Sequence, residues 1–425
     1  MISHHELDTL VAVARELSPY YRELYAGLPS RPTLEQLPVV EQKSFWAANT
    51  QRDNRLLTGP LHDGMVFKSG GTTGEPKFSI YSRVEWEAFT GVFGMGLDAG
   101  GLQEGERIAN LFYVGDLYSS FIFIMRSLDH ARANTLQLPL SGRADPATVE
   151  HAVADFGLTT LVGTPTTLLT LATHYIAAGK TAPAVRRLLF GGESMYADQR
   201  ATLARAFPNA SARSVGYASV DAGLLGYDDE SCGPDEHRMF SRYAIIEIID
   251  EVDGTPIREE GKVGRVVVTN LTRLLMPIIR YPAGDMACWS EPAGSNPDRR
   301  FRLMGRSEEG ARVGPATLYI EDVRRVLGMF HDPLGATDFQ LVVEHAQHRD
   351  RLTLRLASEA AAAQQATLGA AIVQRLHAER PMLPDLIAQD LIHPLAIEWT
   401  APGSLEINER SGKLKRVIDR RHEQR

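Results

Sequence analysis

A glycine-rich stretch at residues 69–77, Ser-Gly-Gly-Thr-Thr-Gly-Glu-Pro-Lys, has the composition of a loop that binds phosphate. Its glycines let the main chain turn sharply and approach a ligand closely. Hydroxyl and exposed backbone N–H groups donate hydrogen bonds to phosphate oxygens, and Lys77 adds a positive charge. The stretch lacks the Gly-Lys-Ser/Thr ending of a Walker loop. We therefore expect a polyphosphate site formed by Ser69, Gly70, Gly71, Thr72, Thr73, Gly74 and Lys77.

The residues around this stretch predict its structural setting. Val66-Phe67 precede it, and the alternating residues Phe78-Ser79-Ile80 follow its lysine. Alternation is typical of a strand, so the loop is expected to join two strands of a hairpin. The simpler alternative is a flexible Gly/Ser/Thr turn without a ligand. The lysine that follows the last glycine favours the phosphate site.

Further along the chain, strand-like and helix-like segments alternate at short intervals. Strands are expected at residues 107–114, 133–138, 159–163 and 185–190, and helices at 84–96, 119–128, 146–156, 165–178 and up to 207. This alternation predicts an α/β fold with a mainly parallel sheet and helical crossovers. Ligands bind beyond the carboxyl ends of such strands. The candidate pocket residues at these ends are Tyr113, Gly163, Thr164, Gly191, Gly192, Glu193, Gly216 and Tyr217.

After residue 236 the pattern changes to short strands separated by Gly, Asp and Pro, which predicts a β subdomain with strands at 243–249, 264–270 and 276–280. A composition boundary near residue 305 divides the chain into a large domain, 1–304, and a small α+β domain, 305–425. In the small domain the expected elements are a helix at 320–330, strands at 339–344 and 352–356, a helix at 360–380, a strand at 396–399 and a basic helix at 414–425.

Composition limits the classes of function. A formal net charge of −8 argues against bulk nucleic-acid binding. Cys232 and Cys288 are the only cysteines, which excludes a disulfide framework and fits a reducing cytoplasm. No run approaches the roughly 20 apolar residues of a membrane span, and the first residues do not resemble a secretory signal. We expect a cytoplasmic protein without nucleic-acid or membrane partners.

Six stretches resemble, in the same order, the motifs of the adenylate-forming superfamily: the acyl-CoA synthetases, luciferases and peptide-synthetase adenylation domains. They lie at residues 69–77, 191–195, 217–221, 280–285, 305–309 and 410–416. Each motif alone is weak, but the ordered set is strong. The resemblance implies a large domain followed by a small, mobile one. It also implies that ATP activates a carboxylate to an acyl-adenylate with release of pyrophosphate.

The resemblance also implies roles for single residues. Lys413 would be catalytic, Asp221 would bind Mg²⁺, and Glu308 would lie at the hinge between the domains. The residues implied for adenine and ribose binding are Gly192, Glu193, Ser194, Tyr217, Asp285 and Arg306. The structural alternatives are a solvated lysine, aspartates that cap a helix or a turn, a core tyrosine, and a glutamate at a helix N-terminus.

The sequence indicates the identity of the activated acid less clearly than it indicates the reaction. The short N-terminal region and the ending Gly-Lys-x-Lys-Arg-Val-Ile-Asp resemble the phenylacetate–CoA ligase branch, which implies an aromatic carboxylate. One such acid is a secondary-metabolite aryl acid, for example a phenazine carboxylate of antibiotic biosynthesis. The residues expected to contact the acyl group are Phe112, Tyr113, Gly163, Gly216 and Ala218. For the aromatic residues, a place in the core is the alternative.

Departures from the family pattern concern the acceptor of the acyl group. Val220 replaces the usual hydroxyl residue, and Asp221 is one methylene shorter than the usual glutamate. Gly314-Pro315 stand where CoA-using relatives carry an Arg-Gly pair, and proline has a fixed φ and no N–H. This argues against CoA and favours transfer to a carrier protein, an amine or a reductase. The alternatives are an aryl-CoA ligase and a non-catalytic nucleotide-binding homologue; a homodimer is left open.

Overall fold

The computed structural model describes residues 2, 4–69, 77–251, 253–294, 296–306, 310–330, 334, 338–358, 360, 362–401, 404–406 and 414–421. Of the predicted site residues, Gly70 to Gly74, Glu308 and Lys413 lie outside this set, and for Arg306 only the backbone is described. The chain divides into two compact units. One takes in residues up to Met304 apart from 70–76 and 195–199, and the other is centred on residues 305–425.

The first unit begins with short helices and a β-hairpin. The helices are α1 (Leu7–Leu17), α2 (Pro19–Leu24), the 3₁₀ helix η1 (Leu34–Gln36) and α3 (Gln42–Ala48). The strands β1 (Met65–Ser69) and β2 (Lys77–Tyr81) pair antiparallel, and Ser69 lies opposite Lys77. The predicted hairpin is therefore confirmed, with the glycine-rich stretch between its two strands.

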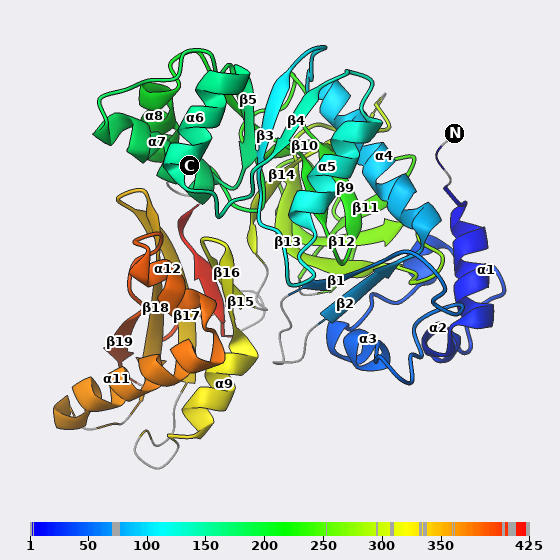
Figure 1. Cartoon of the computed structure of the whole chain (residues 1–425). Coiled ribbons are helices and arrows are strands. Elements are labelled where there is room, and N and C mark those ends of the chain that lie inside the picture. Colours follow the sequence, from blue (N-terminus) through cyan, green and yellow to red (C-terminus); the bar gives the residue numbers. More distant parts are fainter. Residues whose placement is uncertain are drawn as a thin grey trace. The chain divides into compact units, whose positions relative to one another are not determined.

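A five-stranded parallel sheet follows in the order β4-β3-β5-β6-β7 (Figure 1). Its strands are β3 (Arg107–Leu111), β4 (Leu136–Pro139), β5 (Thr160–Gly163), β6 (Arg187–Phe190) and β7 (Ser211–Ser214). The helices before and between them are α4 (Arg83–Ala99), α5 (Ser120–His130), α6 (Pro146–Phe156), α7 (Pro165–Ala177) and α8 (Ala197–Ala206). The predicted parallel sheet with helical crossovers is confirmed.

The first unit also contains a seven-stranded antiparallel sheet in the order β11-β12-β13-β14-β10-β9-β8. Its strands are β8 (Tyr217–Ser219), β9 (Gly223–Tyr227), β10 (Glu236–Met239), β11 (Ala244–Ile249), β12 (Gly264–Asn270), β13 (Tyr281–Trp289) and β14 (Arg300–Arg306). This sheet therefore begins before residue 236, earlier than expected. The prediction of a strand at 276–280 was wrong. Met276, Ile278 and Ile279 are fully buried in the core, so the apolar run reflects burial and not strand pairing.

The second unit is built on the sheet β19-β18-β17-β20. Its elements are the hairpin β15 (Gly310–Val313) and β16 (Ala316–Tyr319), α9 (Ile320–Gly328), β17 (Asp338–Ala346), β18 (Arg349–Ala357), α11 (Ala362–Glu379), α12 (Met382–Ala388), β19 (Ala396–Thr400) and β20 (Val417–Asp419) (Figure 1). The prediction of a basic helix at 414–425 was wrong. Within the described residues 414–421, Val417–Asp419 form a strand parallel to β17, and Arg420 and Arg421 pair with acidic residues of the same unit. In the part of the chain that is described, no helix is both long and apolar enough to span a membrane.

Candidate functional site

Of the predicted phosphate residues, the structure describes Ser69 and Lys77, the pair that closes the hairpin. The side chain of Lys77 is buried against α3. Its Nζ donates a 3.2 Å hydrogen bond to Gln42 Oε1 and lies 5.4 Å from the centroid of the Trp46 ring. Gln42 in turn donates through Nε2 to the carbonyl of Pro282, at 2.8 Å. The hairpin is thus linked to the segment that contains the predicted ribose residue, Asp285.

The predicted magnesium ligand, Asp221, lies beside the same hairpin. Ser79 Oγ donates a 2.9 Å hydrogen bond to Asp221 Oδ1, and the Tyr81 hydroxyl donates to the Val220 carbonyl at 2.7 Å. Arg273, which is fully buried, donates to the carbonyls of Asp221 and Ile80 at 2.8 and 2.9 Å. A buried guanidinium with two backbone acceptors holds the two segments side by side.

Ser79, Tyr81 and Arg273 were not predicted as site residues. Ser79 and Tyr81 had a weak signal, because they alternate on the strand that follows the predicted phosphate loop. Arg273 had no signal in the sequence, since it lies in an apolar run between two predicted strands.

Two residues from separate motifs meet directly. The Tyr217 hydroxyl donates a 2.5 Å hydrogen bond to Asp285 Oδ2, and both side chains are half-buried. Gly284, just before the aspartate, has a φ of +82°, in the region that favours glycine. An aromatic ring beside a carboxylate matches the needs of a nucleoside, because the ring can stack on a base and the carboxylate can accept hydrogen bonds from ribose hydroxyls.

The hydroxyl of Tyr217 is expected to orient Asp285 for a nucleotide. In the variant Tyr217→Phe, the ring remains but the bond to Asp285 is lost. We expect the KM for ATP to rise about tenfold, because one hydrogen bond to a charged group contributes about 1.5 kcal/mol. Steady-state kinetics would measure this, and the matched control is Tyr227→Phe, which removes a tyrosine hydroxyl that donates to Asp298 Oδ2 at 3.0 Å. An unchanged KM would contradict the role.

A buried histidine, His237, lies beside the ring of Tyr217. Ser214 Oγ lies 2.8 Å from His237 Nε2 and accepts the N–H of Gly216 at 3.1 Å. The rings of His237 and Tyr217 have centroids 5.8 Å apart. Gly216 has a φ of +121°, and a Cβ there would lie 2.8 Å from Phe93 Cζ. The turn before Tyr217 is therefore restricted to glycine. Burial lowers the pKa of His237 to about 4.

This lowered pKa predicts a loss of stability in mild acid. The unfolded state binds the proton near pH 6.5 and the folded state only near pH 4, so stability falls as the pH drops through this window. Between pH 7.5 and pH 5 we expect His237 to contribute a loss of about 2 kcal/mol. Urea unfolding at both values measures it. In the variant His237→Gln, which has no titrating group at this position, the loss of stability between these pH values should be smaller by about 2 kcal/mol. An equal loss in both proteins would contradict the prediction.

The Arg280 side chain of the predicted ribose motif has a structural partner. It forms two 2.9 Å bonds with the Glu247 carboxylate, and its third nitrogen donates to the Leu37 carbonyl at 2.6 Å. Both side chains are buried. Burial raises the pKa of Glu247, and the Arg280 charge opposes that shift. The pair fixes the segment that leads to Asp285.

No family model matches the chain, but comparison with known proteins finds similar sequences and a similar fold. It is 26% identical over 442 residues to a phenylacetate–coenzyme A ligase of Thermus thermophilus, covering 99% of this chain and 96% of the relative. An indoleacetate–lysine synthetase of Pseudomonas savastanoi is 24% identical over 63% of both chains. The fold matches a crystal structure of 2-hydroxyisobutyryl-CoA ligase with a TM-score of 0.69, at 19% identity, covering 98% of this chain and 88% of that one.

Over nearly its whole length the chain is similar to phenylacetate–CoA ligases, and these matches support an adenylate-forming ligase. The similarity to phenylacetate–coenzyme A ligases supports acid activation through an adenylate. This was the prediction from the six ordered motifs, and it is confirmed.

The Glu193 carboxylate accepts hydrogen bonds at the N-terminus of a helix. Thr166 donates to Glu193 Oε2 through its hydroxyl at 2.5 Å and its N–H at 3.3 Å. Thr166 lies in the first turn of α7, so the carboxylate lies at a positive helix end. Gly192, with a φ of +81°, makes the turn between β6 and Glu193, and Ser194 follows half-buried. The structural alternative for Glu193 placed it at the N-terminus of the helix that follows the turn, whereas its contacts are with the N-terminus of the preceding helix, α7.

The residues predicted to contact the acyl group lie at strand ends but differ in exposure. Phe112 is buried in the core with α4 and α5. Tyr113 is half-buried beyond β3, where burial raises the pKa of its hydroxyl and a hydrogen bond to Thr167 opposes that shift. Ala218 is also half-buried. Gly163 and Gly216 place the backbone against Leu111 and Phe93, and a side chain on either glycine would crowd these neighbours.

In the second unit, Gly314 and Pro315 form the two-residue turn of the hairpin β15–β16, since Val313 pairs with Ala316. The Gly314 N–H donates to Asp350 Oδ2 at 2.9 Å. Asp350 also binds Arg421 at 2.6 Å and His345 at 3.0 Å, and all three side chains are buried. Burial opposes but does not outweigh these partners, so the pKa of Asp350 lies below its usual range. The turn is held by a buried ionic cluster.

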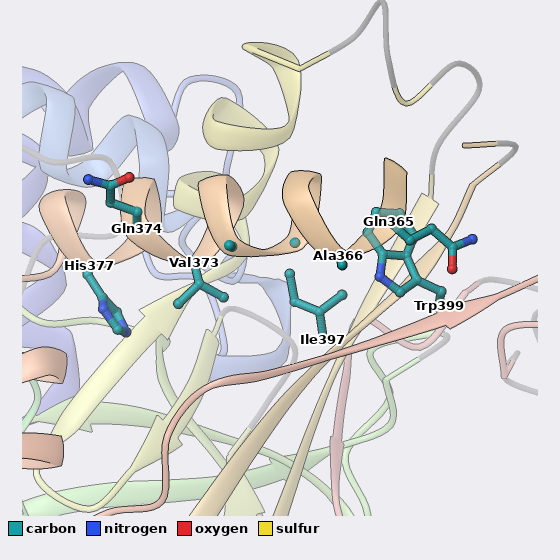
Figure 2. Close-up of a pocket in the computed structure, with 9 residues that line it drawn as sticks. Gln365, Ala366, Val373, Gln374, His377, Ile397 and Trp399 are labelled. Atoms are coloured by element: carbon teal, nitrogen blue, oxygen red, sulfur yellow. The ribbon is translucent and has the colours of Figure 1, made fainter. Parts of the chain in front are cut away.

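An open groove of about 520 Å³ lies between α11 and β19. Figure 2 shows Val373 and Ile397 facing each other across it, with Trp399 at one end. Its lining is mostly apolar with two glutamines and His377, and it contains none of the residues predicted to bind ATP or the acid. We do not assign the groove to the active site. Among the described residues there is also no cluster of three or more His, Cys, Asp or Glu side chains suited to a metal ion.

Proposed function

We propose that this ligase activates an aromatic carboxylic acid with ATP and Mg²⁺, and that it passes the acyl group to an acceptor other than CoA. The observation that carries the proposal is that two hydrogen bonds bring predicted site residues together within the first unit. Tyr217 binds Asp285, and Asp221 binds Ser79 on the hairpin strand that begins at Lys77. An aromatic ring, a ribose-binding carboxylate, a metal-binding carboxylate and a cationic hairpin together suit a nucleoside triphosphate.

Each residue has a distinct task in the proposed reaction. The glycine-rich stretch binds the β- and γ-phosphates, and Tyr217 with Asp285 holds the nucleoside. Asp221 binds Mg²⁺, which takes one or two carboxylates together with phosphate oxygens and therefore fits a single aspartate. Lys413 neutralises the charge that develops when the carboxylate attacks the α-phosphate. Because both reactants are anions, the rate depends on positioning and electrostatic stabilisation.

The proposal for the acceptor rests on the hairpin β15–β16. A proline in its two-residue turn removes one backbone donor and fixes one φ. The Asp350 carboxylate accepts the N–H of Gly314 in the turn, and a Cβ on Gly314 would lie 3.1 Å from Ile392 Cγ2. A turn so constrained differs from the flexible Arg-Gly pair of CoA-using relatives. One relative is named for joining an acid to lysine, which makes an amine the first acceptor to test.

The test has two stages. A panel of aryl and alkyl carboxylic acids is screened by ATP–pyrophosphate exchange, and each positive acid is then offered CoA or an amine such as lysine. We expect exchange with aryl acids, amide formation with the amine and little thioester. Exchange with no acid of the panel would contradict activation of an aromatic acid.

The second candidate is an aryl-CoA ligase. It is favoured by the match to a phenylacetate–coenzyme A ligase over 99% of the chain. Rapid thioester formation from CoA in the second stage would establish it and overturn the proposal of another acceptor. The adenylation step is common to both candidates.

A further inference from the structure

The turn that contains Asp221 lies partly inside the first unit. Val220, Asp221 and Ala222 form the loop of the hairpin β8–β9, in which Ser219 pairs with Gly223. Such loops usually lie at the surface, where water binds their carbonyl groups. Here Ala222 is fully buried, and Val220 and Asp221 are half-buried. The carbonyl groups of this turn therefore need hydrogen-bond donors from the protein.

Three buried side chains supply these donors, one to each carbonyl group of the turn. The bonds are Tyr81 Oη to Val220 at 2.7 Å, Arg273 Nη1 to Asp221 at 2.8 Å and Asn270 Nδ2 to Ala222 at 3.1 Å. All three donor side chains are at most 1% exposed. They belong to two segments that are distant from the turn in the sequence, β2 and residues 270–273. The core of the first unit therefore sets the position of this turn.

The guanidinium of Arg273 connects the turn to the neighbouring strand. Its second terminal nitrogen donates to the Ile80 carbonyl at 2.9 Å, so one planar group binds both segments. It also lies 4.0 Å from the centroid of the Tyr81 ring, in a cation–π contact. Its Nε is buried and finds no acceptor among the described residues, which lowers stability. Packing and stability alone therefore do not account for an arginine at this position.

The same strand restrains the carboxylate of Asp221. Once its main chain is held, an aspartate retains only two side-chain torsions, and the 2.9 Å bond from Ser79 Oγ to Oδ1 restrains both. Ser79 and Tyr81 are two positions apart on β2, so both side chains lie on the same face of the strand. Mg²⁺ requires near-ideal octahedral geometry, so a small displacement of a carboxylate ligand weakens its binding.

We propose that Arg273 and Tyr81 are positioning residues for the Asp221 carboxylate, an inference that rests on the proposed role of Asp221 as a ligand of nucleotide-bound Mg²⁺. The pair holds the main chain of the turn against β2, and β2 places Ser79 beside the carboxylate. Both side chains are fully buried and act only through Asp221. Loss of either contact should therefore weaken the metal-dependent part of ATP binding and leave the metal-independent part unchanged.

The first test measures ATP binding to the full chain by calorimetry, with Mg²⁺ and again with the metal removed by EDTA. In Tyr81→Phe we expect the Kd of ATP with Mg²⁺ to rise about threefold to tenfold, because one hydrogen bond to the turn is lost and the ring remains. Without metal, the Kd should stay within about twofold of the wild type.

The matched control is Tyr21→Phe. It removes another fully buried hydroxyl of the first unit that donates to a backbone carbonyl, that of Pro277 at 2.9 Å. Both dissociation constants of this control should stay within about twofold of the wild type. An equal rise with Mg²⁺ in Tyr21→Phe and Tyr81→Phe would overturn the inference, because any lost buried hydroxyl would then have the same effect.

Arg273→Lys is the stronger variant. It keeps the positive charge, but an ammonium lacks the planar fork that binds two carbonyl groups at once. We expect its Kd of ATP with Mg²⁺ to rise about tenfold to 100-fold, again with little change without metal. If Arg273→Lys does not fold, Tyr81→Phe decides the result, since its ring keeps the stacking contact with Phe89. A folded Tyr81→Phe with both constants at wild-type values would overturn the inference.

The variant Asp221→Ala separates positioning from a general structural role. If the pair acts through Asp221, then Tyr81→Phe changes the Kd of ATP by no more than about twofold in the Asp221→Ala background. An equal further rise in both backgrounds would overturn the inference. Wild-type constants in Tyr81→Phe and Arg273→Lys, with the effect of Mg²⁺ lost in Asp221→Ala, would also overturn it and leave the proposed function intact. A full effect of Mg²⁺ in Asp221→Ala would instead overturn the proposed metal role of Asp221, and the inference with it.

Discussion

Replacing Lys413 by alanine is expected to lower ATP–pyrophosphate exchange about 100- to 1,000-fold, the usual effect of removing one group that stabilises charge in a transition state. The carboxylate and the α-phosphate are both anionic, and the lysine supplies the opposing charge when they meet. Binding of ATP should change little, because Tyr217, Asp285 and Lys77 remain. Exchange kinetics and equilibrium ATP binding measure the two effects separately.

The matched control for this result is Lys415→Ala, which removes the same charge two positions along the chain. The Lys415 side chain is exposed, and among the described residues Lys415 contacts Glu406 and Gln340 through its backbone. We expect this control to keep most of the wild-type exchange. Equal losses in the two variants would show that the general charge of the tail matters and that Lys413 has no special role.

Replacing Arg280 by methionine is expected to destabilise the first unit by about 3–5 kcal/mol, the usual cost of leaving a buried charge without its partner. Glu247 would lose both bonds to the guanidinium, and the Leu37 carbonyl would lose its donor. Urea unfolding, followed through the transition of this unit, gives the free energy directly.

The control for Arg280→Met is the double variant Arg280→Met/Glu247→Leu, which removes the second charge as well. Because apolar side chains of similar volume often replace a buried ion pair without loss, we expect it to recover most of the stability. A single variant within about 1 kcal/mol of the wild type would contradict the prediction. It would mean that Glu247 is already neutral or reaches water when Arg280 is absent.

Local patterns in the sequence were sufficient for much of the fold. The strand–helix alternation predicted the parallel sheet, and the residues flanking the glycine-rich stretch predicted the hairpin β1–β2. Both rest on periodicity within a few residues, which reflects the side-chain geometry of a single element. The six motifs together predicted an adenylate-forming ligase, because each is a short contiguous stretch.

The two wrong predictions have one cause. The apolar run at 276–280 and the basic run after 414 were interpreted as elements from their composition. In the first case, burial in the core accounts for the apolar residues. In the second, Arg421 pairs with Asp350 and Asp419, and the described part of the tail forms a strand beside β17. Partners far along the chain determined both structures, and a local pattern contains no information about them.

The sequence by itself determined which residues able to catalyse or bind are present and in what order. This was enough to predict the family and the reaction class. Only the tertiary structure decided which of them meet. Tyr217 and Asp285 are 68 residues apart and share a hydrogen bond, and Gln340 donates to the carbonyls of Glu406 and Lys415, which are 66 and 75 residues away. Such contacts depend on how strands are ordered within a sheet, which is set by burial of the whole core and not by the spacing of neighbouring residues.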